Sequence, residues 1–221
     1  MDAFTFDGLL TFWSRRWDDV LELVGEHLAV VGMSLLIATV LGVLLGVAVW
    51  NRPMPRALVI AAAGVAITIP SLALLALLTP VFGLGWTPTV FSLVFYSLLP
   101  IVRNTAVGLR EVPPAIMESA KGMGMSPMKI LISVQLPLAW PIILTGVRVA
   151  AQLTIGIAAI AAYVAGPGLG QLIFQGLSSL GSKNALNFAL TGTVGVAALA
   201  LIVDGIFVIV TKYTTSRGLR A

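Results

Sequence analysis

Long apolar runs without charge, separated by short polar stretches, dominate this chain. The stretches 28–49 and 57–78 contain no Asp, Glu, Lys or Arg, and each reaches the roughly 20 residues that a helix needs to cross a bilayer. Runs of this length predict membrane helices. We expect five spans, which in chain order are 28–49, 58–78, 87–102, 138–165 and 188–210.

The composition agrees with that pattern. Of the 221 residues, 58% are hydrophobic and 10% are charged, whereas soluble domains carry about 25% charged residues. The expected fold class is therefore all-α, a polytopic bundle of membrane helices. The chain has no cysteine, which excludes disulfides, thiol catalysis and cysteine-bound metals.

The basic residues indicate which loops face the cytoplasm. With five spans, the loop after the first span, the long loop 103–137 and the tail 211–221 share one face, and their Lys and Arg residues make that face cytoplasmic. The N-terminus is then outside and the C-terminus inside. The expected regions are an external segment 1–27, a transmembrane domain 28–210 and the tail. The same distribution explains the net charge of +4 without a nucleic-acid partner.

The external segment has the spacing of an amphipathic helix. Phe12, Trp13 and Trp17 are among its apolar positions, so we expect it to lie at the lipid interface as an anchor. His27, the only histidine, is expected at the interface as well, at the mouth of the first span.

The loop 103–137 is long for a connection and predicts a structure of its own. Prolines 113 and 114 open a first helix at 115–121, and Gly124 offers the left-handed backbone of a tight turn. Ser126 and Pro127 have the residue types of an N-cap and a first helical position.

A second helix should then run to Val134, where Leu136 and Pro137 stop it. Its residues are mostly apolar, with only Lys129 and Ser133 to solubilise it. Such a surface implies a covering partner or the bilayer itself.

The spacing of residues in this loop resembles a known motif. Glu118-Ser119-Ala120, three residues, Gly124, nine residues, Val134, one residue and Leu136-Pro137 resemble the EAA loop of ABC-importer permeases, whose pattern is EAA, three residues, G, nine residues, I, one residue, LP. Only Ser119 and Val134 depart from it. The resemblance implies a coupling helix at 126–134, seated in a cleft of an ATPase subunit. The implied coupling residues are Glu118, Ala120, Gly124, Ser126, Pro127, Lys129, Ile130, Leu136 and Pro137.

Other segments look like one branch of these permeases, the importers of glycine betaine, choline, carnitine or related quaternary amines. The segments are Ile69-Pro70-Ser71, Ile101 to Thr105, Gly108, Glu111-Val112-Pro113, Gly122 to Ser126, Gly146-Val147-Arg148 and Gly166 to Gly170. The fold implied is that of type I ABC importers, similar to methionine permeases. Amino-acid importers share this fold and loop, so an amino-acid permease is the alternative.

The resemblance also implies partners and a location. The partners are a dimer of ABC ATPases, a second copy of the permease or a homologous permease, and an external substrate-binding protein. The location is the cytoplasmic membrane of a prokaryote, where membrane lipid surrounds the chain. ATP and magnesium would be bound by the ATPase and no cofactor by this chain. None of the four lysines follows a glycine, which excludes a P-loop, and a single histidine supports no zinc site or Ser-His triad. We expect a transport subunit and no enzyme.

Three residues inside the expected spans are candidates for the transport pathway or a gate. Arg148 and Asp204 fall at similar depths in the fourth and fifth spans, where charges usually face a partner or a wet cavity. They can form a structural ion pair or act in gating, and both interpretations stay open. Pro70 lies within the second span, where it kinks a helix for packing or frees backbone groups for a substrate path.

The residues of the expected spans allow two further interpretations, an aromatic binding site and an ion-coupled transporter. Aromatic rings can bind a quaternary ammonium, although ordinary packing also explains them, and the candidates are Phe91, Phe95, Tyr96, Trp140 and Tyr163. In an ion-coupled secondary transporter, Pro70, Arg148 and Asp204 would be coupling sites. Five spans without a second inverted half argue against that class.

Overall fold

The computed structural model describes residues 6–215, so the parts of the expected N-terminal segment and tail at 1–5 and 216–221 lie outside the described residues. All regular elements within this range are helical. They are α1 (Phe6–Val49), α2 (Pro53–Thr68), α3 (Ser71–Phe82), α4 (Trp86–Arg110), α5 (Pro114–Gly122), α6 (Pro127–Ile130), a π turn (Leu131–Gln135), α7 (Leu136–Ala161), a 3-10 turn (Ala162–Val164), α8 (Gly170–Ser178) and α9 (Ala185–Thr214).

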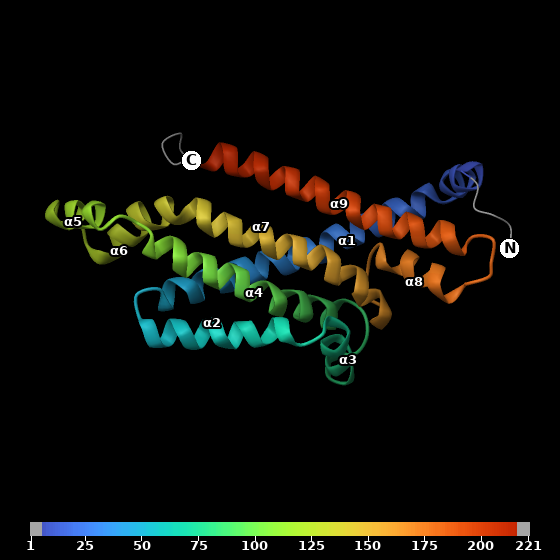
Figure 1. Cartoon of the computed structure of the whole chain (residues 1–221), viewed down its shortest axis with the longest axis horizontal. Coiled ribbons are helices and arrows are strands. Elements are labelled where there is room, and N and C mark those ends of the chain that lie inside the picture. Colours follow the sequence, from blue (N-terminus) through green and yellow to red (C-terminus); the bar gives the residue numbers. More distant parts are fainter. Residues whose placement is uncertain (1–5, 216–221) are drawn as a thin grey trace.

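The long helices lie side by side along the longest axis of the molecule (Figure 1). Helix α4 is central and packs against α1 and α7, while α9 and α2 lie on opposite sides of this core. Helices α5 and α6 gather at one end, near the start of α2 and the end of α9. Helix α8 and the start of α1 lie at the other end.

By length and composition, α1, α4, the continuous helix Pro127–Val164 and α9 can cross a membrane, and the bent pair α2 and α3 adds a fifth candidate. The expected all-helical bundle is confirmed. The second span is bent near Pro70, where a kink was expected, and α2 and α3 meet there at 95°. Pro70 sits at this break, where it lacks the N–H of a helical residue. The hydroxyl of Tyr96 donates to the Ile69 carbonyl there at 2.6 Å.

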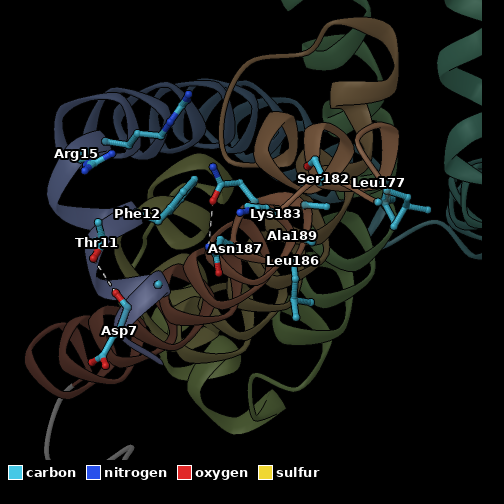
Figure 2. A pocket seen from close by; sticks show the side chains of 17 residues that line it. Asp7, Thr11, Phe12, Arg15, Leu177, Ser182, Lys183, Leu186, Asn187 and Ala189 are labelled. Carbon is cyan, nitrogen blue, oxygen red and sulfur yellow. Dashed lines mark hydrogen bonds between the residues drawn. The ribbon is translucent and has the colours of Figure 1, made fainter. Parts of the chain in front are cut away.

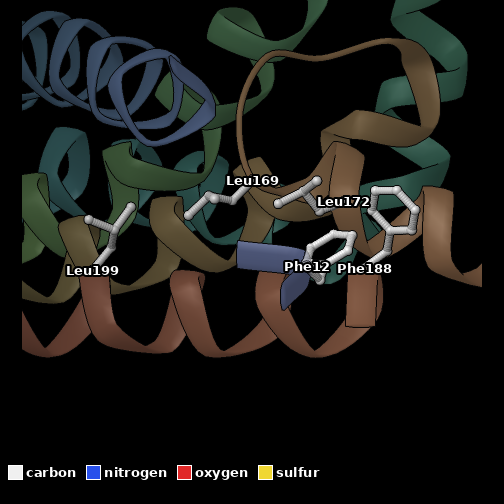
Figure 3. Close-up of a cluster of buried hydrophobic side chains, with 5 residues drawn as sticks. All are labelled: Phe12, Leu169, Leu172, Phe188 and Leu199. Carbon is white, nitrogen blue, oxygen red and sulfur yellow. The ribbon is translucent and has the colours of Figure 1, made fainter. Parts of the chain in front are cut away.

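Helix α1 begins far before the expected first span. Its 44 residues include a non-helical backbone at Arg16. At its start, Phe12 joins a buried cluster (Figure 3) with Leu169, Leu172, Phe188 and Leu199. The Trp13 indole donates to Thr191 Oγ1 at 2.8 Å. The N-terminal segment therefore packs on α8 and α9, in addition to any lipid contact.

His27 is enclosed by protein, which was not expected of a residue at the mouth of the first span. Its side chain is fully buried, and Nε2 lies 3.2 Å from the Ile155 carbonyl oxygen. Gly168 packs so closely that a Cβ added there would lie 2.7 Å from His27 Cβ. His27 is buried because a loop far along the chain packs against α1. The hydropathy of the residues around His27 gives no sign of this contact.

Helix α4 also extends beyond the expected span, to Arg110. Arg103, expected in the cytoplasmic loop, is therefore part of the helix. The extension is held by packing, because Thr105, Ala106 and Leu109 are buried.

The two glycines at 42 and 46 allow α1 to approach α4 closely. A Cβ at Gly42 would lie 2.7 Å from Ile101 Cγ2, and one at Gly46 would lie 2.6 Å from Thr105 Cβ. These small residues therefore make a helix contact, by the close approach seen at membrane helix interfaces.

Candidate functional site

The predicted helix-turn-helix is present at one end of the molecule as α5 and α6 (Figure 1). Gly124 turns the chain with a φ of +77°, a left-handed backbone that glycine adopts without the steric cost of a Cβ. The Met125 amide donates across the turn to the Ala120 carbonyl at 3.2 Å. Ala120 is buried beneath it. The left-handed backbone of Gly124 and the hydrogen bond across the turn therefore determine its shape.

Helix α6 starts as its residue types predict. The Lys129 amide donates to Ser126 Oγ at 3.4 Å, a long N-cap bond, and Pro127 takes the first helical position. Ile130 is buried and faces the protein. The exposed surface of this region is apolar at Met123, Met128 and Ile132, which are 74%, 64% and 57% exposed.

Leu136 and Pro137 do not stop this helix, contrary to expectation. The helix passes through the π turn and continues as α7, so that 127–164 form one unit. The Leu136 amide donates to the Leu131 carbonyl, five residues back. This wider turn accommodates Pro137, which has no N–H to give. The predicted coupling helix and the fourth span are therefore mechanically continuous.

The nine predicted coupling residues do not all face outward. Glu118, Gly124, Ser126, Pro127 and Lys129 are exposed on the hairpin, and Pro137 is exposed at the start of α7. The remaining three, Ala120, Ile130 and Leu136, are buried or half-buried and face the protein. The sequence motif therefore mixes residues of an outer surface with residues that hold that surface in place.

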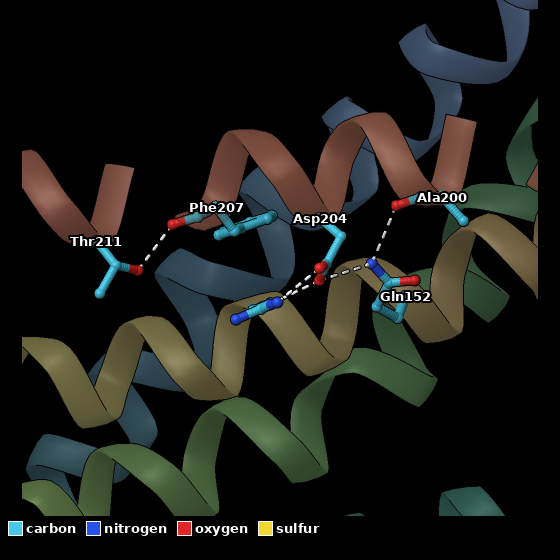
Figure 4. A network of polar contacts seen from close by, with 6 residues as sticks. Gln152, Ala200, Asp204, Phe207 and Thr211 are labelled. Carbon is cyan, nitrogen blue, oxygen red and sulfur yellow. Dashed lines mark hydrogen bonds and ion pairs between the residues drawn. The ribbon is translucent and has the colours of Figure 1, made fainter. Parts of the chain in front are cut away.

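Arg148 on α7 and Asp204 on α9 pair as two parallel hydrogen bonds. Arg148 Nε donates to Oδ1 and Nη2 donates to Oδ2, each at 2.6 Å. The side chains are 39% and 35% exposed. Gln152 Nε2 donates to Asp204 Oδ1 at 3.3 Å and to the Ala200 carbonyl at 3.2 Å (Figure 4).

Sequence reasoning missed Gln152. The signal was available, because positions four apart share one face of a helix and Gln152 follows Arg148 by one such step. Pro70 is not part of this cluster: it joins α2 to α3, whereas the pair joins α7 to α9. The three intramembrane candidates therefore form two separate features.

The other end of the molecule contains a hollow of about 1570 Å³ between the start of α1 and the connection from α8 to α9 (Figure 2). Asp7, Arg15, Arg16 and Lys183 give it charged walls. The Arg16 guanidinium lies 4.9 Å from the centre of the Phe188 ring. Nothing in the sequence pattern predicted this hollow, since its walls come from segments that are far apart in the chain.

The glycine-rich segment 166–170 lies at the same end of the molecule as this hollow. Gly168 has a φ of +103°, and its amide donates to Glu26 Oε2 at 3.1 Å. Helix α8, which follows it, was not predicted. Its Gly170 is packed so tightly that a Cβ would lie 2.0 Å from the Ala159 carbonyl oxygen, so tertiary packing determines where this short helix begins.

Comparison with solved structures supports the fold. The inward-facing MetNI methionine ABC transporter matches with a TM-score of 0.77 and 23% identity, over 89% of this chain and 96% of that chain. The fold is therefore that of a type I ABC importer permease.

Similarity in sequence is closer and extends over most of the chain. The glycine betaine/carnitine/choline transport system permease protein OpuCB of Bacillus subtilis is 35% identical over 96% of both chains. The osmoprotectant import permease protein OsmW of Salmonella typhimurium is 35% identical over 90% of this chain and 93% of that protein. Residues 28–215 match the family described as the binding-protein-dependent transport system inner membrane component. With its apolar spanning helices, the chain is a multi-pass protein of the cytoplasmic membrane, and it belongs to the family of binding-protein-dependent transport system inner membrane components.

Proposed function

We propose that this chain is the permease subunit of an ATP-driven importer of osmoprotectants such as glycine betaine, choline or carnitine. The observation that carries the proposal is the similarity to permeases of that class, which extends over nearly the whole length of both chains. The chain itself would form part of the pathway and perform no catalysis. A partner ATPase would bind ATP and magnesium.

The hairpin of α5 and α6 is proposed as the contact with the ATPase. Its apolar residues Met123, Met128 and Ile132 are exposed, and burial of such a patch is a normal driving force for association. Because α6 continues into α7, a displacement of the hairpin would move the fourth span together with it. The Arg148–Asp204 pair would carry that movement to α9.

This assignment orients the molecule. The end with α5 and α6 would face the cytoplasm, with the C-terminus on the same side and the N-terminus outside. The hollow at the opposite end would then face the external substrate-binding protein. A second permease, identical or homologous, would complete the pathway, and the two open states would alternate as the ATPase subunits close and separate.

Purification of the intact complex from its native membrane tests the proposal. An ATPase and a binding protein are expected to co-purify, and the binding protein should bind glycine betaine, choline or carnitine in a calorimetric titration. If the binding protein bound amino acids alone, the substrates would be amino acids instead of osmoprotectants. Purification without any ATPase would contradict the proposed energy source.

A further inference from the structure

A groove lies on the side of the helix core, away from the Arg148–Asp204 ion pair. It has a volume of about 350 Å³, at the small end of the range of about 300 to 1000 Å³ for ligand sites. Its walls come from α2, α4 and α7, and include Ile67, Leu99, Arg103, Asn104 and Val149. The groove therefore touches three of the candidate spans, and it begins close to the break between α2 and α3.

Arg103 is the only charged residue in the walls of this groove. Within residues 6–215, no hydrogen bond or ion pair engages its guanidinium, in contrast to Arg148 with its two bonds to Asp204. The Asn104 amide donates to the Pro100 carbonyl at 2.7 Å. The groove thus offers an unpaired guanidinium and no carboxylate.

Arg103 also lies within helix α4 instead of at its end. It precedes Arg110, the last residue of α4, by seven positions, or about 10 Å along a helix. The side chain of Arg103 is exposed, and an unpaired guanidinium can bind a group of opposite charge.

Helix α4 also carries aromatic rings toward its other end. Phe91, Phe95, Leu99 and Arg103 recur every four residues, so they form a stripe that winds around the helix by about 40° at each step. Phe91 and Phe95 are 52% and 36% exposed. Phe82 of α3 stacks on Phe91 with ring centres 4.5 Å apart. The stripe therefore runs from aromatic rings to a guanidinium.

We propose that this winding stripe of α4 lines the transport pathway and that Arg103 is a specificity-determining residue that binds the carboxylate of zwitterionic osmoprotectants. Glycine betaine and carnitine combine a quaternary ammonium with a carboxylate, whereas choline has the ammonium alone. The rings at 91 and 95 suit the ammonium, and a guanidinium suits a carboxylate through two parallel bonds. The positions 95 and 103 are about 12 Å apart along the helix, so the two contacts would be made in succession as the solute moves. The inference rests on the proposed function.

The experiment uses the complete complex, with its ATPase and saturated binding protein, reconstituted in liposomes. Initial uptake of glycine betaine and of choline is compared for the wild type, Arg103→Gln, Arg103→Lys and Arg110→Gln. Arg110 is the matched control, because it is an exposed arginine on the same helix but does not line the groove. Size-exclusion chromatography checks that each variant assembles.

Arg103→Gln is expected to lower uptake of glycine betaine about tenfold, the effect of losing one charge-assisted contact, and to leave choline uptake within about twofold of the wild type. Arg103→Lys should recover part of the loss, because it keeps the charge and loses the planar fork. Arg110→Gln should behave as the wild type with both substrates.

An equal loss for both substrates, or the same loss from Arg110→Gln, would overturn the role of Arg103 and leave the proposed function intact. If Arg103→Gln does not assemble, the ratio of glycine betaine to choline uptake in Arg103→Lys decides, and an unchanged ratio overturns the inference. A wild type that imports choline alone would also overturn it. A wild type that imports neither would contradict the proposed function itself, and this inference with it.

Discussion

Arg148 and Asp204 join α7 to α9 through two hydrogen bonds of 2.6 Å each. Helix α9 is otherwise the least enclosed of the four continuous candidate spans, since 6% of its apolar window is buried. The pair is therefore a defined attachment point between α9 and the helix that continues from α6.

Removing one partner of this pair should impair transport more than exchanging the two charges. Arg148→Ala or Asp204→Ala leaves an unpaired charge within the span, and we expect each to lower uptake by about an order of magnitude. The exchanged variant Arg148→Asp/Asp204→Arg should recover part of the activity. Gln152→Leu removes a single bond of 3.3 Å to Asp204 and should have a smaller effect. Uptake in vesicles measures all four variants, and absence of any rescue by the exchange would count against the attachment role.

The close approach of α1 and α4 predicts a steric effect at Gly46. Gly46→Ala places a Cβ 2.6 Å from Thr105 Cβ, and overpacking of this kind costs about 1 to 3 kcal/mol. Gly32→Ala is the matched control on the same helix, because nothing lies within 4 Å of a Cβ there. Thermal unfolding in detergent should show a lower Tm for Gly46→Ala than for the wild type, and an unchanged Tm for Gly32→Ala. Equal Tm values for the two variants would mean that the helices can separate without cost.

Gly124 should be needed for coupling because of its backbone and not because of its surroundings. Nothing lies within 4 Å of a Cβ at Gly124, but its φ is +77°, and a left-handed residue with a Cβ costs about 1 to 2 kcal/mol. Gly124→Val is expected to leave membrane insertion intact and to reduce uptake per ATP hydrolysed. Gly122 has equally open surroundings without a positive φ, so Gly122→Val is the control. Parallel assays of ATPase activity and uptake give the ratio, and a normal ratio in Gly124→Val would contradict the account of the turn.

The break between α2 and α3 should depend on Tyr96. Tyr96→Phe removes the 2.6 Å hydrogen bond to the half-buried Ile69 carbonyl, and a hydrogen bond of this kind contributes about 0.5 to 1.5 kcal/mol. Tyr163→Phe is the control, since Tyr163 is 61% exposed. Tyr96→Phe should lower the Tm in detergent and Tyr163→Phe should not. If both variants unfold like the wild type, another contact holds the break.

Features set by local residue types could be predicted from the sequence. The apolar runs predicted the spans, because a bilayer requires them. The turn at Gly124 and the start of α6 at Ser126 and Pro127 followed from residues that favour those backbone positions.

Features set by contacts between distant segments could not be predicted. His27 is buried because Gly168 packs against it. Pro137 continues a helix because a π turn precedes it. The bend at Pro70 reaches 95°, whereas a proline by itself indicates only a kink or a break. The Arg103 groove also needs three helices that are separate in the sequence.

The most direct measurement of the central claim is uptake of labelled glycine betaine by liposomes that contain this chain with its ATPase, in the presence of the binding protein. The proposed function predicts accumulation that requires Mg-ATP on the side of the ATPase and that continues when ionophores collapse the ion gradients. Uptake that an ion gradient alone drives, without ATP or the ATPase, would contradict it.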